Sequence, residues 1–316
     1  MDHAREEQPA SEPDAATSRG VAGASVAPLT RLSPTDILAL QRTAGNRAIT
    51  AGLRLLQREP PPLSQHSTAP NTAVHGQAFV RGAGDISDID ANDVNQGLLG
   101  DCNLLAPMAA VARANPEAIR RLITARPDGT YDVTLYYKDH FWSDRTAHTV
   151  NVTSQFYTDA GGSPLYARYG DASELWVMLI EKAYARHMGS YSDAVGAMWD
   201  REGLELLTGN GAHEDGVGSG SEDDVLTAIS QKLTEGKAVT VNTSTSRWRR
   251  WRTTDAQQRE MDSLGIVRDH AYSIEAVDTH AKTLNLRNPW GFRHLTNLPV
   301  AAFRSYFNTW SWVDVR

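Results

Sequence analysis

The most chemically reactive residue of the chain is Cys102, which is its only cysteine. It follows Gly100 and Asp101, where the glycine permits a tight turn and the aspartate can cap a helix that begins at Cys102. A thiol in this position lies at the positive end of the helix dipole, which favours the thiolate and lowers the thiol pKa. An isolated cysteine is more often a small buried apolar residue. The Gly-Asp-Cys context is what favours a nucleophile here.

A cysteine nucleophile requires a histidine that exchanges a proton with it and a third group that orients the imidazole. His270 stands at the start of an apolar strand, where its ring can be held rigidly beside a cleft. Asn288 precedes Pro289, which keeps Asn288 extended and ends a strand. The Asn288 amide can bond an imidazole that faces it, and Trp290 can cover that bond from water. A structural histidine and an ordinary Asn-Pro turn are the simpler interpretations of the same residues.

Five sequence motifs follow one another along the chain in a fixed order. They are Gln-Gly-x-x-Gly-Asp-Cys-x-Leu-Leu at 96–105, Glu-Lys-Ala-Tyr-Ala at 181–185, a run from Glu-Gly to Thr-Gly at 202–209, His-Ala-Tyr-Ser at 270–273 and Arg-Asn-Pro-Trp-Gly at 287–291. In this order they resemble the core of the calpain cysteine proteases. The resemblance covers about residues 93–316, and the ordered set is far more specific than any one motif alone.

The resemblance implies a papain-like α+β fold in two lobes, a helical one and a β-rich one, with a cleft between them. Cys102 would be the nucleophile, His270 the general base and acid, and Asn288 the residue that orients His270. Gln96, six residues before Cys102, would form the oxyanion hole together with the Cys102 backbone N–H. Trp290 would shield the contact between His270 and Asn288.

Calcium is the one cofactor that the resemblance raises, although the chemistry itself requires none. Asp93 and Glu181 match two acidic positions of the first-lobe calcium site of calpains. The acidic residue that follows Asn-Pro-Trp-Gly in the family is missing, since residues 292–294 are Phe-Arg-His, and we expect no second-lobe site. Two carboxylates do not make a hard-cation site, and Asp93 can equally cap a helix while Glu181 pairs with Lys182.

Two residues of the first motif region depart from the family pattern. Asn103 stands where the family has a bulky aromatic residue after the cysteine. Pro107 falls inside the expected helix, where it removes the hydrogen bond to the carbonyl of Asn103 and costs about 3 kcal/mol or demands a kink. We therefore expect different packing on the substrate side of the cleft.

The rest of the chain divides by composition. Its first 30 residues are rich in Ala, Ser, Pro and acidic residues, which cannot bury enough surface to order a segment. A short helical pattern with five arginines follows, and then a Pro-rich stretch. The expected organisation is a disordered tail over 1–30, a helical docking or targeting module over 31–58, a linker over 59–90, and the calpain-like core over 91–316, with a helical lobe over about 91–210 and a β-rich lobe over about 211–316.

Within the core, helical periodicity marks residues 101–125, 172–187 and 223–235. Alternating apolar and polar residues predict strands over 130–158, 238–243, 270–278, 283–287 and 309–315. The acidic, Gly-rich stretch between 213 and 224 is expected to be a flexible surface connection. Helices that precede a β-rich half indicate an α+β protein.

Net charge and hydropathy argue against nucleic acid and a membrane span as partners of this chain. The net charge of −7 over 316 residues argues against nucleic acid, which binds basic surfaces. No apolar run approaches the 20 residues that a membrane span needs, and the N-terminus lacks the apolar region of a signal peptide. The resemblance implies protein substrates. The lack of a signal peptide predicts a protein that is cytoplasmic or exported by a non-classical route.

Residues 40–58 resemble an N-terminal module of bacterial toxin-like and contractile-injection cargo proteins. This resemblance implies an effector that a secretion or injection apparatus recognises through residues 31–58 and delivers into a target cell. Two alternatives to a protease stay open on the sequence. One is a non-catalytic calpain-like binding module, and the other is a different papain-fold thiol enzyme, such as a transglutaminase or an amidase.

Overall fold

The computed structural model describes residues 71–82, 86–138, 144–159, 161–170, 173–243 and 254–316. The tail predicted over 1–30, the module over 31–58 and the first part of the linker lie outside the described residues. The end of the expected linker differs from the prediction. Strand β1 (Asn71–Ala73) pairs with β5 (Gln155–Tyr157), so the core already includes this segment.

The first lobe combines helices with a small antiparallel sheet. Its sheet has the order β2-β3-β4, and a 3-10 turn, η2, precedes the nucleophile region. The elements are η2 (Ala91–Asp93), α2 (Cys102–Ala114), α3 (Pro116–Arg120), β2 (Ile123–Ala125), β3 (Thr130–Lys138), β4 (Arg145–Thr153), α4 (Trp176–Met188), α5 (Tyr191–Ala194) and α6 (Asp200–Thr208).

Helix α2 begins at Cys102, as predicted, but it ends at Ala114 rather than near residue 125. Asn115 is extended because Pro116 follows it, and its side chain accepts a hydrogen bond from the Glu117 backbone N–H to cap α3. Local chemistry at Asn115-Pro116 therefore overrides the helical periodicity and turns the chain toward β2.

Pro107 lies inside α2 without ending it. The Asn103 carbonyl that loses its helical partner faces Gly203 of α6. A Cβ added to Gly203 would lie 2.3 Å from the Asn103 oxygen and 2.8 Å from Pro107 Cγ. The two helices thus approach closely only because residue 203 carries no side chain.

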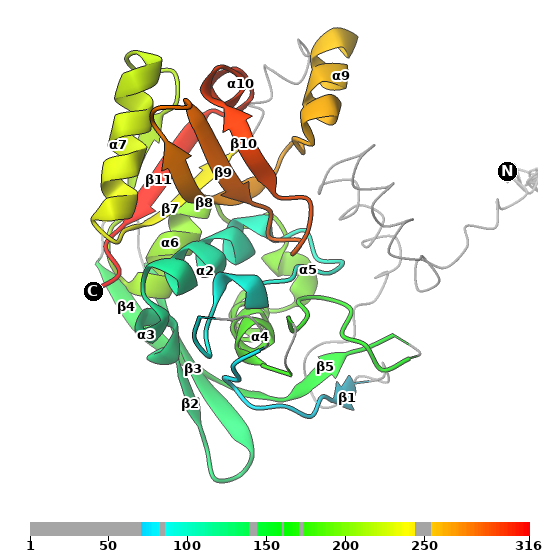
Figure 1. Ribbon diagram of the computed structural model, residues 1–316. Coiled ribbons are helices and arrows are strands. Elements are labelled where there is room, and N and C mark those ends of the chain that lie inside the picture. Colours follow the sequence, from blue (N-terminus) through cyan, green and yellow to red (C-terminus); the bar gives the residue numbers. More distant parts are fainter. Residues whose placement is uncertain (1–70, 83–85, 139–143, 160, 171–172, 244–253) are drawn as a thin grey trace, which may run out of the picture.

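The second lobe is built on a six-stranded antiparallel sheet of order β10-β9-β8-β7-β11-β6. In Figure 1 this sheet lies above α2, with α7 along one side. Strand β11, from the C-terminal end, lies between β7 and β6. The elements are β6 (His213–Gly216), α7 (Glu222–Thr234), β7 (Ala238–Asn242), α9 (Asp255–Leu264), β8 (Ala271–Asp278), β9 (Thr283–Arg287), β10 (Leu295–Pro299), α10 (Val300–Tyr306) and β11 (Thr309–Val313).

The acidic stretch after residue 212 is more ordered than expected. Its first four residues form the edge strand β6, which pairs with β11 from His213 opposite Trp312 to Gly216 opposite Thr309. The His213 ring also stacks on Trp312 at 4.1 Å between ring centroids. A partner strand more than 90 residues further along the chain supplies this order, so local composition could not indicate it.

Each lobe has its own apolar core, and α2 lies between them. One core gathers residues of α2, α4 and α6 and the other gathers residues of the large sheet with α7 and α10. Helix α2 packs against α6 on one side and against β7 and β8 on the other. The predicted α+β, two-lobed architecture is confirmed for the described residues.

Two asparagines of the first lobe hold the end of the chain that leaves β11. The Asn115 amide donates to the Val315 carbonyl at 2.7 Å, and the Asn210 amide donates to the Asp314 carbonyl at 2.8 Å. Val313 and Val315 are buried in the core of the first lobe. The lobes are therefore joined at this end by contacts that do not involve Cys102 or His270.

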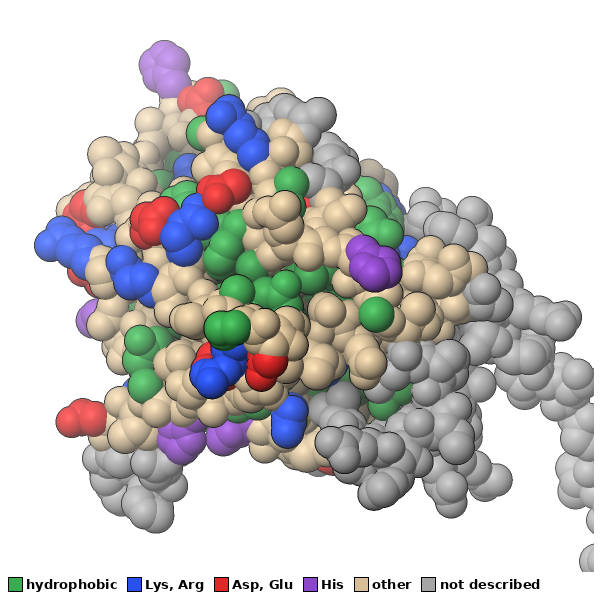
Figure 2. Space-filling model, turned by 90° about the horizontal axis from the view of Figure 1, so that it is seen from below, with side chains coloured by type: hydrophobic (Ala, Val, Ile, Leu, Met, Phe, Trp, Pro, Cys, Tyr) green, Lys and Arg blue, Asp and Glu red, His purple; other side chains and the backbone are tan. Residues whose placement is uncertain are grey.

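Neither a membrane-spanning helix in the described residues nor a continuous basic surface on the face of Figure 2 is present. None of its helices combines the length and the apolar character that crossing a bilayer requires. On the face shown in Figure 2, Lys and Arg side chains are interspersed with Asp and Glu. Such a face lacks the continuous positive surface on which phosphate backbones bind.

Candidate active site

Cys102 is the first residue of α2, and its side chain is only 4% exposed. It forms a small buried cluster with Ala106, one turn further along the helix, and with Ala271. Ala271 opens β8 and directly follows His270. The structure thus brings the start of α2 from one lobe against the start of β8 from the other, where His270 stands.

His270 and Asn288 are in direct contact. His270 Nε2 lies 2.9 Å from Asn288 Oδ1, and the backbone N–H of Trp290 donates to the same oxygen at 3.0 Å. Because that N–H can only donate, the atom that faces both groups is the amide oxygen. Nε2 must therefore carry the proton, which leaves the imidazole lone pair on Nδ1.

The backbone of His270 is held as firmly as its ring. Its N–H donates to Thr243 Oγ1 at 3.0 Å, and its carbonyl accepts from the Thr243 N–H at 2.9 Å. Thr243 directly follows β7, the strand beside β8. The imidazole consequently has little freedom to leave the position that the sheet gives it.

Trp290 lies beside the His270 ring. Its side chain is 1% exposed, and its ring centroid is 4.7 Å from that of His270. The Tyr272 ring meets His270 edge-on at 4.9 Å. These aromatic walls exclude water, and the resulting burial lowers the pKa of His270 from 6.5 to about 4, although the bond to Asn288 acts in the opposite direction. At neutral pH the ring is uncharged and can accept a proton.

The lowered pKa of His270 predicts a pH dependence of stability. Between pH 6.5 and 4 the unfolded chain protonates this residue and the folded chain does not, so the unfolding free energy falls as the pH falls. The full contribution of His270 is about 3 kcal/mol. Urea unfolding of the wild type and of His270→Gln at pH 7 and pH 4 measures it. Equal pH slopes for the two proteins would contradict the assignment.

Gln96 is near the nucleophile, but its amide nitrogen does not point at Cys102. Nε2 donates to the Leu99 carbonyl at 2.6 Å and to Asp101 Oδ1 at 3.2 Å, while Oε1 is buried without a hydrogen-bond partner. Both amide hydrogens are thereby used within the 96–101 loop. A role of Gln96 as an oxyanion donor requires its side chain to rotate.

Gly97 explains the fixed position of the loop that carries Gln96. A Cβ at residue 97 would lie 1.9 Å from the Tyr166 carbonyl oxygen and 2.5 Å from that of Leu165. The adjacent Leu98 N–H donates to the same Leu165 carbonyl at 2.8 Å. Only glycine permits this close approach of two backbones.

Asp101 occupies the N-cap position of α2 but makes no side-chain capping bond. Its carboxyl group turns inward instead, to Gln96 and Glu181, and is 3% exposed. Burial raises the pKa of Asp101 to about 7, and burial beside Asp101 raises the pKa of Glu181 well above its usual value. The expected cap is therefore wrong, because the side chain is drawn into a buried carboxyl pair that the sequence did not indicate.

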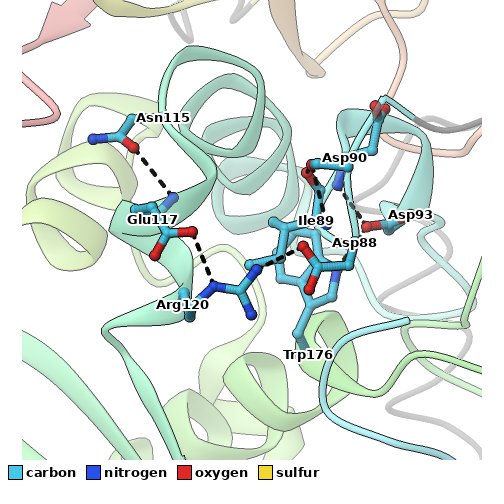
Figure 3. A network of polar contacts seen from close by, with 9 residues as sticks. Asp88, Ile89, Asp90, Asp93, Asn115, Glu117, Arg120 and Trp176 are labelled. Carbon is cyan, nitrogen blue, oxygen red and sulfur yellow. Dashed lines mark hydrogen bonds and ion pairs between the residues drawn. The ribbon is translucent and has the colours of Figure 1, made fainter. Parts of the chain in front are cut away.

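Asp93 and Glu181, the candidate calcium ligands, each bind protein donors. Asp93 Oδ2 accepts from the Asp90 N–H at 2.7 Å and from Trp176 Nε1 at 2.8 Å, as Figure 3 shows. Glu181 accepts from the Ala167 N–H at 2.9 and 3.1 Å through its two oxygens. Across the described residues, no three His, Cys, Asp or Glu side chains gather into a metal-binding group. Calcium binding by Asp93 and Glu181 therefore stays a prediction.

Sequence reasoning did not single out Arg287 and His294, which surround Asn288. The Arg287 guanidinium donates to Asn92 Oδ1 at 2.9 Å and to the Val94 carbonyl at 3.3 Å, across the boundary between the lobes. His294 Nδ1 accepts from the Asn288 N–H at 3.1 Å. Arg287 was inside the quoted Arg-Asn-Pro-Trp-Gly motif, and its position next to Asn288 was the signal that could have revealed it.

Comparison with known proteins places this site in a family. The sequence profile of the calpain family cysteine proteases matches residues 76–311, so the chain belongs to the calpain family. Among curated relatives, the calpain-2 catalytic subunit of Gallus gallus is 28% identical over 205 residues, and calpain-8 of Rattus norvegicus is 30% identical over 205 residues. The calpain-type cysteine protease DEK1 of Arabidopsis thaliana is 28% identical over 216 residues.

The matched region is a large part of this chain but a small part of each relative. It is 63% of this chain but 28% of calpain-2 and of calpain-8. It is 64% of this chain and 9% of the Arabidopsis protein. The chain thus corresponds to a limited part of these relatives.

Proposed function

We propose that the chain is a cysteine endopeptidase whose nucleophile is Cys102 and whose general base and acid is His270. The observation that supports it most is the geometry around the imidazole. Asn288 fixes the tautomer that leaves the lone pair on Nδ1, and Ala271, the residue after His270, packs against Cys102 at the helix start.

The proposed reaction begins when His270 Nδ1 accepts the Cys102 proton and the sulfur attacks a peptide carbonyl carbon. The tetrahedral intermediate collapses as the imidazolium protonates the leaving amine, which leaves a thioester on Cys102. His270 then takes a proton from water, the hydroxide attacks the thioester, and the proton returns to the sulfur as the acid product departs. Asn288 accepts from Nε2–H throughout and stabilises the transient positive charge.

The oxyanion of both tetrahedral intermediates would be held at the start of α2. Backbone N–H groups in the first turn of a helix have no intrahelical acceptor and point toward incoming negative charge. Rotation of the Gln96 side chain would add a second donor, at the expense of its bonds to Leu99 and Asp101. Substrate binding therefore has to break the hydrogen bonds of Gln96 to Leu99 and Asp101 and replace them with a bond from Gln96 to the oxyanion.

The experiment that tests this function is digestion of an unfolded protein by the purified chain, with products identified by mass spectrometry. New peptide termini support an endopeptidase. Cross-linked products or deamidated glutamines would instead indicate the acyl-transfer or amidase chemistry that the sequence left open. No reaction of any kind would favour a binding module.

Calcium and delivery belong to the same proposal but have separate tests. We expect catalysis without a cofactor, and parallel digests with calcium and with a chelator decide whether Asp93 and Glu181 bind the ion. The proposal of a delivered bacterial effector, recognised through residues 31–58, depends only on the sequence of that segment. Export of a fusion to residues 31–58 measures it.

A further inference from the structure

We propose that Arg287 is a positioning residue: its buried guanidinium fastens the Asn288 turn of the second lobe to the 92–96 segment of the first lobe and so aligns His270 with Cys102. This inference rests on the proposed function, because it concerns the alignment of that same catalytic pair.

Arg287 is the last residue of β9 and is 4% exposed. A guanidinium so deeply buried is costly unless its donors are used. Two of them reach the other lobe, to Asn92 Oδ1 and the Val94 carbonyl. Burial lowers the pKa of Arg287, and the nearby carboxylates of Glu275, Asp90 and Asp93 act in the opposite direction and favour its charged form. Within its own lobe, Nη1 also lies 3.4 Å from His294 Nε2, and Nε is buried without a hydrogen-bond partner, so the two bonds to the first lobe are the main ones that hold the cation.

Further contacts join the segment 287–291 of the second lobe to the segment 92–96 of the first lobe, and we call this set of contacts the seam. The Gln96 N–H donates to the Pro289 carbonyl at 2.8 Å, two residues beyond Arg287. A Cβ added to Gly291 would lie 3.1 Å from the Asn95 side chain, so the two segments are in close contact there as well. The seam ends on Asn288, whose Oδ1 holds the His270 ring. A shift of this turn would therefore move the imidazole.

The first-lobe side of the seam is itself rigid. Asp93, between Asn92 and Val94, is fixed by the Trp176 indole of α4 and by the Asp90 N–H (Figure 3). The Asn95 carbonyl accepts from the Arg168 N–H at 2.8 Å. Arg287 therefore binds to a segment that α4 holds in place, and it transmits the position of the first lobe to Asn288.

The lobes are also joined elsewhere, so loss of Arg287 should leave the chain folded. The buried Asp200 of α6 accepts from Thr240 Oγ1 at 2.8 Å and from the Asn242 amide at 2.9 Å, both on β7. The residues after β11 bind the first lobe through Asn115 and Asn210. Arg287 would then matter for alignment more than for assembly.

The test compares Arg287→Met with the matched control Arg304→Met. Arg304 of α10 also donates to two carbonyls, those of Gly218 and Gly220, but both lie within the second lobe. We expect Arg287→Met to lower kcat about tenfold with little change in KM, and Arg304→Met to leave both unchanged. Arg287→Lys, which keeps the charge but not the two-pronged geometry, should recover part of the loss.

A second readout does not depend on peptide hydrolysis. Because Cys102 is the only cysteine, the rate of iodoacetamide alkylation at pH 7 reports on it alone. His270→Ala defines the rate of a thiol without its base. Arg287→Met should fall toward that rate while its thermal unfolding remains cooperative, and Arg304→Met should keep the wild-type rate.

The variant Asn92→Ala removes the first-lobe acceptor of the Arg287 hydrogen bond. We expect a smaller decrease in alkylation rate, about threefold, and no further decrease when Asn92→Ala is added to Arg287→Met.

A wild-type alkylation rate in a folded Arg287→Met variant, or additive losses in the double variant, would overturn the inference. If Arg287→Met fails to fold, Asn92→Ala is the deciding variant. Alkylation of Asn92→Ala at the same rate as the wild type would then overturn the inference. A wild type that alkylates rapidly but cleaves no protein would overturn the proposed function and leave this comparison valid.

Discussion

Replacement of Cys102 by alanine should lower kcat for protein cleavage by about 10⁴-fold or more, to the level of the background assay. The sulfur is the only cysteine nucleophile in the chain, and the Nδ1 lone pair of His270 has no other role in the proposed reaction. Quantitative mass spectrometry of new peptide termini measures the loss. The same variant should take up no iodoacetamide.

The folded state of Cys102→Ala should be nearly unchanged, which makes it a clean test. The thiol belongs to a small apolar cluster with two alanines, and its removal leaves a small void. Thermal unfolding of the variant provides the control. Cleavage at more than a hundredth of the wild-type rate by the folded variant would refute the assignment of Cys102 as the nucleophile.

Replacement of Gly203 by alanine should destabilise the chain by about 2 kcal/mol, although alanine is the better helix former by about 1 kcal/mol. The new Cβ would lie 2.3 Å from the Asn103 oxygen, and a contact that short forces α6 and α2 apart. The midpoint of thermal unfolding should fall by about 4–8 °C. Because Asn103 follows Cys102, the cleavage rate should fall as well.

Gly211→Ala is the matched control for this substitution. A Cβ at residue 211 would meet no atom within 4 Å, so the change should be neutral or slightly stabilising. Equal unfolding midpoints for the two alanine variants would show that α2 and α6 do not depend on the missing side chain of Gly203.

The sequence predicted the elements that carry the site better than the contacts between them. Cys102 at a helix start, His270 before a strand and Asn288 after one are local patterns, and the structure has each of them. The contact of His270 with Asn288 was expected from the family resemblance, because no local signal relates residues 18 positions apart.

What the sequence could not indicate depends on burial and on distant partners. Asp101 has the residue type of a helix cap, yet Glu181 and Gln96 draw its side chain inward. Strand β1 was expected to be linker because its partner, β5, begins more than 80 residues later. The bond of Arg287 to Asn92 spans 195 positions and leaves no trace in either local segment.

The insertion of β11 between β7 and β6 has a consequence for a chain still emerging from the ribosome. The two strands that β11 separates are made about 70 to 100 residues earlier. Until β11 is made, β6 has no strand neighbour and β7 has only β8. The six-stranded sheet that carries His270 is therefore complete only after β11 has been translated.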